Sequence, residues 1–191
     1  MKKLFLIFVI ILLNFMMDIS FTSAGKRSTI DISYSQFDIN KFVKKNYPEL
    51  YKLAIRESGG SSGQPNYKAY NNWGYIGAWA IAEKYVRYYG YKNVTLEAFK
   101  NNSNIFTPEA QLEILLKMIN RNKKHIRCLD KYIGREFNGI FITQNGLIYA
   151  CHLAGAGNVI KYFKTDGKFD PDDNNGVRLS DYLNLKSKKG V

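Results

Sequence analysis

The chain has 191 residues, of which 46% are hydrophobic and 15% aromatic, with only four prolines. These values suit one globular domain and exclude a disordered, collagen-like or repeat architecture. The 28 lysines and arginines outnumber the 16 aspartates and glutamates, and a formal net charge of +12 attracts polyanions of any kind, from nucleic acid to the acidic polymers of a cell envelope.

The N-terminal segment has the pattern of a secretory signal peptide. Lys2 and Lys3 precede a largely apolar run over residues 4–17, and the small residues 22–24 offer a cleavage site. The run is shorter than the roughly 20 residues that a membrane span needs. We therefore expect residues 1–24 to be removed, membrane contact to be limited to them, and the protein to reach the periplasm, the cell envelope or the medium. Export favours envelope polymers, so no nucleic-acid partner is expected.

The mature chain is expected to be helical after a short leader. Residues 25–37 are largely polar without helical periodicity, which predicts a flexible segment before a domain at 38–191. The first helix should begin at Pro48 and end at Gly59, because proline favours the first turn and glycine the position after the last. One stripe of this helix carries Leu50, Leu53, Ala54 and Glu57.

Later segments also show helical spacing. One covers about 78–89, and another begins at Thr107, where a capping threonine is followed by proline. A further helix is expected after Thr143, broken by Gly155 and Gly157. No run alternates at period two, so strands should be few or absent. The expected fold is mainly α, in a single domain.

Two cysteines, Cys128 and Cys151, fit neither a zinc site nor a redox pair in their spacing. Either they pair after export and close a loop of about 20 residues, worth about 3 kcal/mol, or both are buried free thiols. The acidic stretch 170–176 lacks the spacing of a calcium loop and is expected to be a surface turn. We expect no metal site.

Glu57 is the most informative residue. Helical spacing brings its carboxyl onto an apolar stripe at the carboxyl end of a helix. Partial burial and the negative end of a helix dipole both favour a protonated acid. Such an acid in a cleft can protonate the leaving oxygen of a glycosidic bond. The alternative is a solvated glutamate at a fraying helix end.

An aromatic loop follows this helix. Between residues 63 and 79 its rings and amides are Tyr67, Tyr70, Trp73, Tyr75, Trp79, Asn66, Asn71 and Asn72. Flat rings stack on sugars and amides bond to their hydroxyls, so the loop suits a glycan. The alternative is that the rings pack into the core.

Three motifs in order resemble lysozyme-like peptidoglycan-cleaving enzymes of the soluble lytic transglycosylase type. They are RESGG at 56–60, NNWGYIGAWAI at 71–81 and GLIYACHLAGAGNVIKYF at 146–163. The similarity runs over 42–182 and includes GVRLSDYL at 176–183, which is similar to the end of one bacterial branch. The resemblance implies a lysozyme-like helical domain with a glycan-binding groove and without a metal or organic cofactor.

The resemblance also implies roles for individual residues. Glu57 would be the catalytic acid and then the base, and Ser58 would help to hold the site or the sugar. Tyr75, Ile76 and Gly77 would line the floor of the groove. With the aromatic loop included, the residues expected to bind substrate are Ser58, Tyr70, Asn72, Tyr75, Ile76, Gly77, Trp79 and His152.

Two departures from the family pattern bear on activity. Ala80 stands where a glutamine is usual, after Trp79 in place of a tyrosine, and Leu153 replaces an asparagine. His152 stands at the position of another tyrosine. It either donates a hydrogen bond towards Glu57 or the substrate, or fills a gap in helix packing. Substrate choice and activity depend on these positions, whereas the expected fold does not.

Only one good catalytic carboxyl is found, whereas most glycosidases use two. Glu83 lies off the apolar face of its helix and is expected to be solvated. In lytic transglycosylases, as the resemblance implies, the muramic 6-hydroxyl attacks the anomeric carbon after the acid, here Glu57, protonates the leaving oxygen. We therefore expect cleavage of the MurNAc-GlcNAc β-1,4 bond with 1,6-anhydro ends.

Two alternatives stay open at this point. One is a hydrolytic lysozyme of the same fold, and the other is a catalytically inactive protein that binds peptidoglycan or assists envelope assembly. The expected partners are peptidoglycan glycan strands, together with other proteins of the envelope or of a secretion apparatus.

Overall fold

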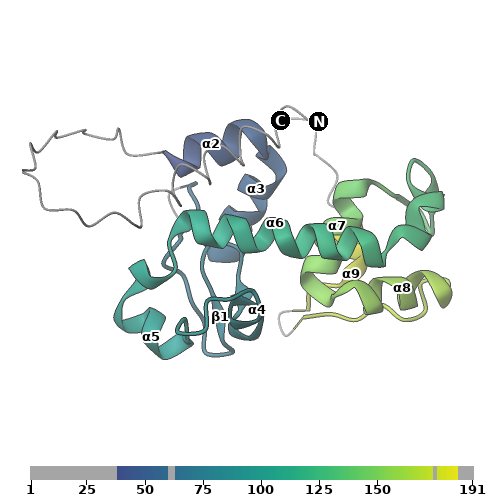
Figure 1. Cartoon of the computed structure of the whole chain (residues 1–191). Helices are drawn as coiled ribbons and strands as arrows, with labels where there is room; N and C mark the ends of the chain where they lie inside the picture. The colour runs from purple at the N-terminus through teal and green to yellow at the C-terminus, as the bar shows by residue number, and fades with distance from the viewer. Residues whose placement is uncertain (1–37, 60–62, 174–175, 185–191) are drawn as a thin grey trace, which may run out of the picture. The chain divides into compact units, whose positions relative to one another are not determined.

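The computed structural model describes residues 38–59, 63–173 and 176–184, which lie in one compact unit. Helices make up 58% and strands 8% of these residues, with two small sheets, so the prediction of a mainly α fold is confirmed (Figure 1). The expected signal peptide and leader over residues 1–37 lie outside the described residues. Within the described ranges, no helix is both long and apolar enough to cross a membrane.

Two short helices open the unit. These are α2 (Ile39–Asn46) and α3 (Pro48–Ser58). As predicted, Pro48 stands in the first turn of α3 and Gly59 ends it, with a φ of 61° that glycine adopts without strain. The buried residues of α3 are Leu50, Leu53 and Ala54. The predicted stripe is confirmed, and it points the face of α3 that carries Glu57 towards the rest of the fold.

The later elements are helices of different lengths and two short hairpins. They are β1 (Tyr75–Ile76), β2 (Ile81–Ala82), α4 (Glu83–Tyr88), α5 (Leu96–Asn101), the 3₁₀ helices η1 (Ser103–Ile105) and η2 (Arg127–Tyr132), α6 (Pro108–His125), β3 (Glu136–Phe137), β4 (Ile140–Phe141), α7 (Gln144–Ala154), α8 (Ala156–Lys164) and α9 (Leu179–Leu183). β1 pairs antiparallel with β2, and β3 pairs antiparallel with β4.

The predicted helix over 78–89 is wrong in its first half. Residues 75–82 form a tight hairpin in which Ile76 pairs with Ile81, and α4 begins only at Glu83. Gly77 and Ala80 have φ values of 77° and 46°, which no right-handed helix contains. Ala78 and Ile81 therefore reach the core from a turn and a strand, whereas Ala82 is only half-buried.

The capping predictions for the two long helices are confirmed. The Thr107 side chain accepts a hydrogen bond from the Ala110 N–H at the start of α6, and Thr143 caps α7 in the same way. Gly155 ends α7, as expected. Gly157 does not break a helix, because a single glycine completes the turn and α8 already begins at Ala156.

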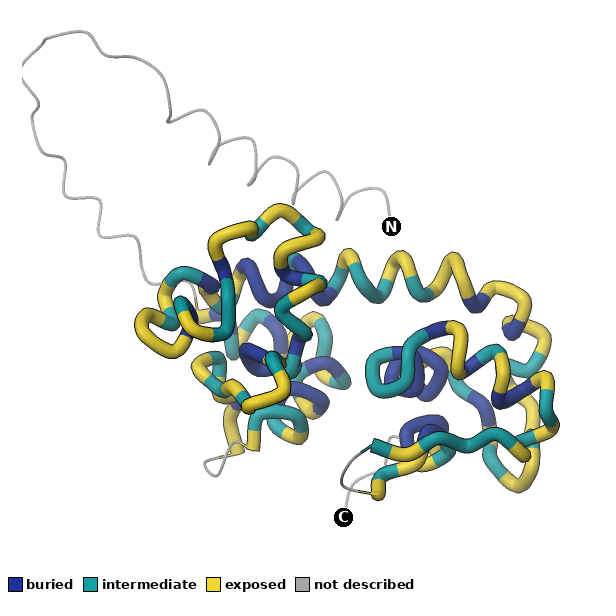
Figure 2. The backbone as a smooth tube through the Cα atoms, turned by 90° about the horizontal axis from the view of Figure 1, so that it is seen from below, coloured by how far each residue is buried: buried dark blue, intermediate teal, exposed yellow. Residues whose placement is uncertain are grey.

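The helix α7 is the buried centre of the fold and contacts α6, α8 and α9. All residues from Gly146 to Cys151 are buried in it. A side chain at Gly146 would meet the Leu183 carbonyl oxygen at 2.5 Å, so this glycine lets α9 approach closely. The buried hydrophobic residues form one cluster, marked dark blue along the chain in Figure 2. The close packing holds α9 in a fixed position near α3.

Candidate active site

Glu57 lies half-buried in the last turn of α3 and is held by a tyrosine from α9. Tyr182 donates its phenol hydrogen to Glu57 Oε1 at 2.7 Å, across 125 positions of sequence. The guanidinium of Arg56 lies 4.4 Å from the centre of the Tyr182 ring, a cation–π contact. Within the described residues Oε2 of Glu57 takes no hydrogen bond, so Tyr182 holds this carboxyl by one oxygen only.

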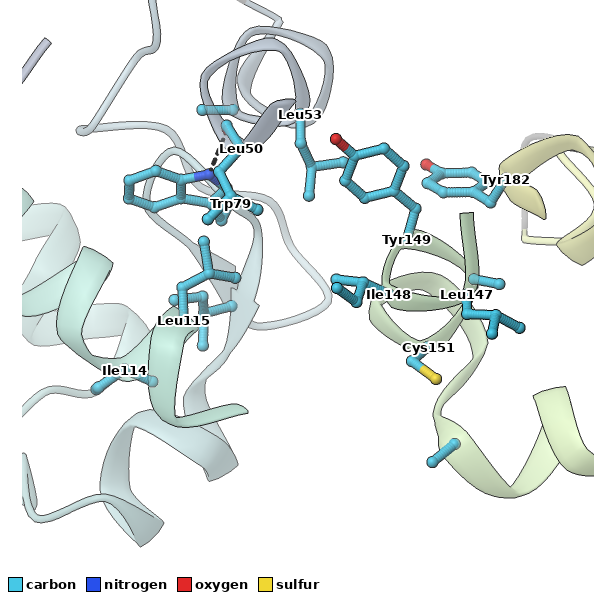
Figure 3. Close-up of a cluster of buried hydrophobic side chains, with 14 of the residues drawn as sticks. Leu50, Leu53, Trp79, Ile114, Leu115, Leu147, Ile148, Tyr149, Cys151 and Tyr182 are labelled. Carbon is cyan, nitrogen blue, oxygen red and sulfur yellow. Dashed lines mark hydrogen bonds between the residues drawn. The ribbon is translucent and has the colours of Figure 1, made fainter. Parts of the chain in front are cut away.

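Tyr182 is a neutral donor over the whole physiological range. Burial raises the pKa of this phenol far above its usual value, and the charge and hydrogen bond of Glu57 raise it further, against a smaller opposite effect of Arg56. The ring is buried between α3, α7 and α9, and Figure 3 shows it beside Tyr149. The phenol can therefore orient the Glu57 carboxyl without exchanging protons with it.

His152 connects Glu57 with a pocket. Its half-buried ring projects from α7, close enough to Glu57 and to the Trp79 backbone for both to act on the imidazole. Burial lowers the pKa of the imidazole below 6.5, although Glu57 and the Trp79 hydrogen bond act in the opposite direction. The ring is therefore neutral near pH 7 and offers one donor and one acceptor.

The pocket has a volume of about 410 Å³ and opens among α4, α6, α7 and the start of α8. Tyr75 and His152, two of the predicted substrate-binding residues, line it. Ala80 and Leu153, the two residues that depart from the family pattern, line it as well. Glu57 is not among the lining residues, so its link to the pocket runs through His152. The other lining residues are Ala82, Lys84, Tyr85, Tyr89, Met118, Arg121, Asn122, His125, Cys151, Ala154, Gly155, Ala156 and Gly157.

Three of the predicted binding residues lie in the core rather than on the surface. Trp79 is 0% exposed, and its ring N–H donates to the Leu50 carbonyl at 2.8 Å (Figure 3). Ile76 and Gly77 are buried as well. A sequence does not show which way an aromatic residue in a loop points. Here the Leu50 carbonyl, in the first turn of α3, accepts the indole N–H, so the ring packs inward with its polar atom satisfied.

Ser58 holds the loop rather than facing a ligand. Its hydroxyl donates to the Ala54 carbonyl at 2.7 Å and accepts from the Asn66 N–H at 2.9 Å. These bonds tie the end of α3 to the beginning of the aromatic loop. Of the two roles implied by the resemblance, holding the site fits these contacts.

Tyr70 and Asn72 are exposed on the aromatic loop, outside the lining of the pocket. Tyr70 is 53% and the neighbouring Trp73 66% exposed, and Lys100 lies 5.2 Å from the Tyr70 ring centre. Asn71 shapes this loop by accepting hydrogen bonds from the N–H groups of Trp73 and Tyr75. The rings of Tyr70 and Trp73 are thus exposed outside the pocket.

Gln111 holds the aromatic loop in place, and the sequence analysis did not single it out. Its buried side chain on α6 accepts from the Ala78 N–H at 2.8 Å and donates to the carbonyls of Tyr67 and Phe106 at 2.9 Å each. A side chain at Gly77 would lie 2.3 Å from its oxygen, so only glycine fits there. A polar residue between the apolar Ala110 and Leu112 was the available signal. The amide fixes the aromatic loop to α6.

Both cysteines are free thiols. Cys128 is exposed in η2, whereas Cys151 is buried in α7, where burial raises the pKa of its thiol to about 12. Of the two predicted states, the free one is present, although only one thiol is buried. In the part of the chain that the structure describes, no three acidic, histidine or cysteine side chains gather into a metal site. Asp170 instead accepts hydrogen bonds from the N–H and hydroxyl of Ser180.

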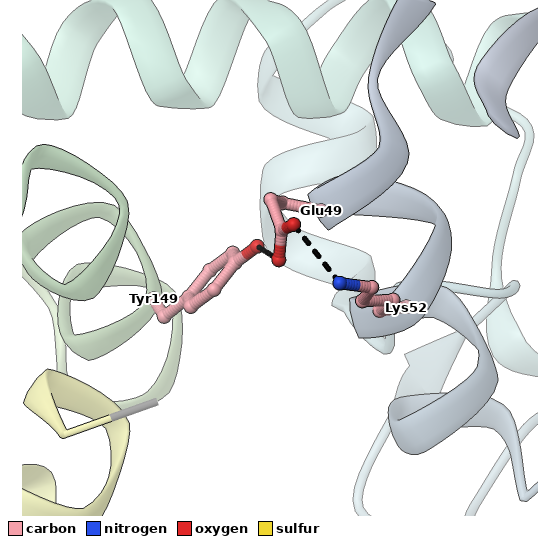
Figure 4. A network of polar contacts seen from close by, with 3 residues as sticks. All are labelled: Glu49, Lys52 and Tyr149. Atoms are coloured by element: carbon pink, nitrogen blue, oxygen red, sulfur yellow. Dashed lines mark hydrogen bonds and ion pairs between the residues drawn. The ribbon is translucent and has the colours of Figure 1, made fainter. Parts of the chain in front are cut away.

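A second glutamate of α3 also meets a tyrosine. Glu49, in the first turn, pairs with Lys52 at 3.0 Å, and Tyr149 Oη approaches its other oxygen at 3.5 Å (Figure 4). That contact is at the outer limit of a hydrogen bond. Glu49 is therefore held mainly by a cation on its own helix.

Comparisons with models of known protein families, with characterised proteins and with solved structures found no match. The chemistry available to the site therefore follows from its own residues. A carboxyl with one oxygen that takes no hydrogen bond from the described residues, a neutral phenol that orients it and a neutral imidazole between it and a pocket are groups that can take part in proton transfer.

Proposed function

We propose that the protein is an exported enzyme that cleaves the MurNAc-GlcNAc β-1,4 bond of peptidoglycan as a lytic transglycosylase. One contact supports this function above the others: the 2.7 Å hydrogen bond from Tyr182 to Glu57 Oε1. It orients a carboxyl at the end of α3 and leaves its second oxygen for a ligand. The lysozyme-like fold and its groove belong to the same proposal.

In this mechanism Glu57 begins as the protonated acid. Its proton passes to the leaving glycosidic oxygen as the bond to the anomeric carbon breaks. The 6-hydroxyl of the same MurNAc attacks that carbon, and its proton goes to the Glu57 carboxylate, which restores the starting state. Tyr182 holds Oε1 throughout, because its raised pKa keeps it a donor. His152 would contact the sugar between the pocket and Glu57.

The surroundings favour an internal nucleophile over a second carboxylate. Hydrolysis with inversion needs a second carboxyl as a base roughly 6.5 to 9.5 Å from the acid, and the usual retaining route needs one as a nucleophile. No aspartate or glutamate lines the pocket. Glu83 accepts a hydrogen bond from the Leu96 N–H and pairs with Arg87, so it serves the fold. A reaction with one carboxyl is the one that these residues suit.

Digestion of purified peptidoglycan tests the function. We expect soluble fragments whose terminal MurNAc is lighter by one water than the hydrolytic product, as measured by mass spectrometry. Fragments that carry the additional water would instead identify the enzyme as a hydrolytic lysozyme. The absence of soluble fragments at every pH and salt concentration tried would contradict cleavage altogether.

One observation favours a second candidate, a peptidoglycan-binding protein without turnover. Tyr75 and His152 line the pocket, but Glu57 does not. Co-sedimentation with insoluble peptidoglycan, in the absence of any release of fragments, would support this candidate. It predicts equal binding by the wild type and by Glu57→Gln, with no difference between them in released products.

A further inference from the structure

The pocket has a cationic side that the cleavage mechanism does not use. Lys84 reaches it from α4, and Arg121 and His125 reach it from α6. Arg121 and His125 are four residues apart, so they lie on the same face of that helix. No aspartate or glutamate is among the lining residues. The pocket therefore has an uncompensated positive charge.

Two neighbouring cations, one on α4 and one on α6, pair with a glutamate of their own helix. On α4, Arg87 pairs with Glu83 at 3.7 Å, and on α6, Lys117 pairs with Glu113. Within the described ranges, Lys84 and Arg121 form no salt bridge with a carboxylate.

Lys84 and Arg121 contact aromatic rings instead. The ammonium of Lys84 lies 5.3 Å from the centre of the Tyr85 ring, and the guanidinium of Arg121 lies 5.4 Å from that of Tyr88. A ring restricts where the cation can go without neutralising its charge. Both groups keep donors for an anionic ligand.

The remainder of the pocket suits a sugar. Tyr75, Tyr85 and Tyr89 offer rings with hydroxyl groups, and Asn122 offers an amide. Flat apolar faces with polar edges match a pyranose, whereas a free inorganic anion would need no rings. Rings and cations in one cavity indicate a ligand that is a sugar and an anion at once.

We propose that the pocket binds a carboxylate-bearing glycan, with the sugar on the tyrosines and the carboxylates of an attached acidic peptide on Lys84 and Arg121. In peptidoglycan these carboxylates belong to the stem peptide, an identification that rests on the proposed function. The enzyme would thus prefer strands with stem peptides over bare glycan. Arg121, with two parallel N–H donors, is the stronger carboxylate contact.

A matched pair of ligands tests this specificity. The first is GlcNAc-MurNAc carrying an alanyl-glutamate dipeptide with free carboxylates, and the second is the same compound with both carboxylates amidated. Binding is measured by titration calorimetry on Glu57→Gln, which prevents turnover. We expect the free acid to bind about threefold to tenfold more tightly at low salt, and the difference to shrink as salt increases.

Charge variants assign the effect to the pocket. Arg121→Gln and Lys84→Gln should each reduce the preference for the free acid while leaving binding of the amidated ligand unchanged. Lys123→Gln is the control, because this exposed lysine lies in the last turn of α6 outside the pocket lining. It removes the same charge and should leave the preference intact.

Three results would overturn the proposal: equal affinity for the two ligands, binding of neither, or an equal loss in Lys123→Gln and Arg121→Gln. The last would indicate a general effect of the net charge. Cleavage of peptidoglycan without a preference for the free acid would support the proposed function and contradict the carboxylate site. A preference for the free acid without cleavage would support the carboxylate site and contradict the proposed function.

Discussion

The two ends of α3 carry the same pair of residue types in different surroundings. At the amino end, Glu49 pairs with Lys52 at 3.0 Å, and Tyr149 approaches at 3.5 Å. At the carboxyl end, Glu57 accepts a 2.7 Å hydrogen bond from Tyr182 and interacts with His152. In the part of the chain that the structure describes, no cation pairs with Glu57.

The difference separates a carboxylate that stabilises the fold from one that is suited to proton transfer. A glutamate at the amino end of a helix and next to lysine is favoured as an anion. A glutamate at the carboxyl end, bonded only to neutral donors, is oriented without being neutralised by a fixed cation. The contrast provides matched variants, because the glutamate, the tyrosine and the neighbouring cation at the Glu57 end each have a counterpart at the Glu49 end.

Removing the carboxyl should produce the largest difference between the two ends. Glu57→Gln keeps the shape and loses the acid, so the rate of fragment release from peptidoglycan should fall about 10²- to 10⁴-fold. Glu49→Gln should release fragments at close to the wild-type rate. Similar rates in the two variants would show that Glu57 is not the acid.

Removing the tyrosine hydroxyls should produce the next largest difference. Tyr182→Phe leaves Glu57 without its orienting donor, and we expect kcat to fall about tenfold to a hundredfold with little change in KM. Tyr149→Phe removes only a long contact to a carboxylate that keeps its lysine. The prediction fails if the two variants have the same kcat, as measured on soluble glycan fragments.

His152, which lies close to Glu57, should make the free energy of unfolding of the protein depend on pH. The folded protein lowers the pKa of this imidazole below 6.5, so below pH 6.5 the unfolded chain binds more protons than the folded one. The free energy of unfolding therefore falls as the pH decreases from 6.5 towards the folded pKa, by no more than about 1.4 kcal/mol per pH unit. Urea unfolding at several pH values should show a flatter dependence for His152→Asn. An unchanged slope would contradict the assignment.

Removing the cation next to each glutamate–tyrosine pair should produce the smallest difference between the two ends. Arg56→Gln removes the cation–π contact with Tyr182 and should lower the free energy of unfolding by about 0.5 to 1 kcal/mol. Lys52→Gln removes an exposed ion pair and should cost about 0.5 kcal/mol or less. Thermal unfolding of both variants compares them. Only Arg56→Gln should also reduce activity, because only it borders the Glu57–Tyr182 pair.

The parts of the fold that follow from local sequence were predictable. Pro48 and Gly59 mark the ends of α3, and Thr107 and Thr143 cap α6 and α7, because each acts through bonds to residues a few positions away. The position of Glu57 on the inner face of α3 followed from the same periodicity. These features required no knowledge of what α3 packs against.

The other parts of the fold and of the candidate site depend on contacts between residues far apart in the sequence, which local patterns do not predict. Tyr182 meets Glu57 across 125 positions, and Gln111 meets Ala78 across 33. The hairpin before α4 depends on Ala80, a residue that adopts positive φ only when its surroundings impose it. Trp79 looked like a sugar platform because periodicity does not indicate direction in a loop. Tertiary packing decided each of these positions.

A crystal structure of Glu57→Gln with a bound peptidoglycan fragment tests the central claim most directly. The sugars should occupy the pocket and pass His152, with the glycosidic oxygen about 2.6 to 3.2 Å from the side-chain amide at position 57. Tyr182 should still contact that side chain. A fragment seated in the pocket with its glycosidic bonds beyond the reach of position 57 would contradict a catalytic role for Glu57.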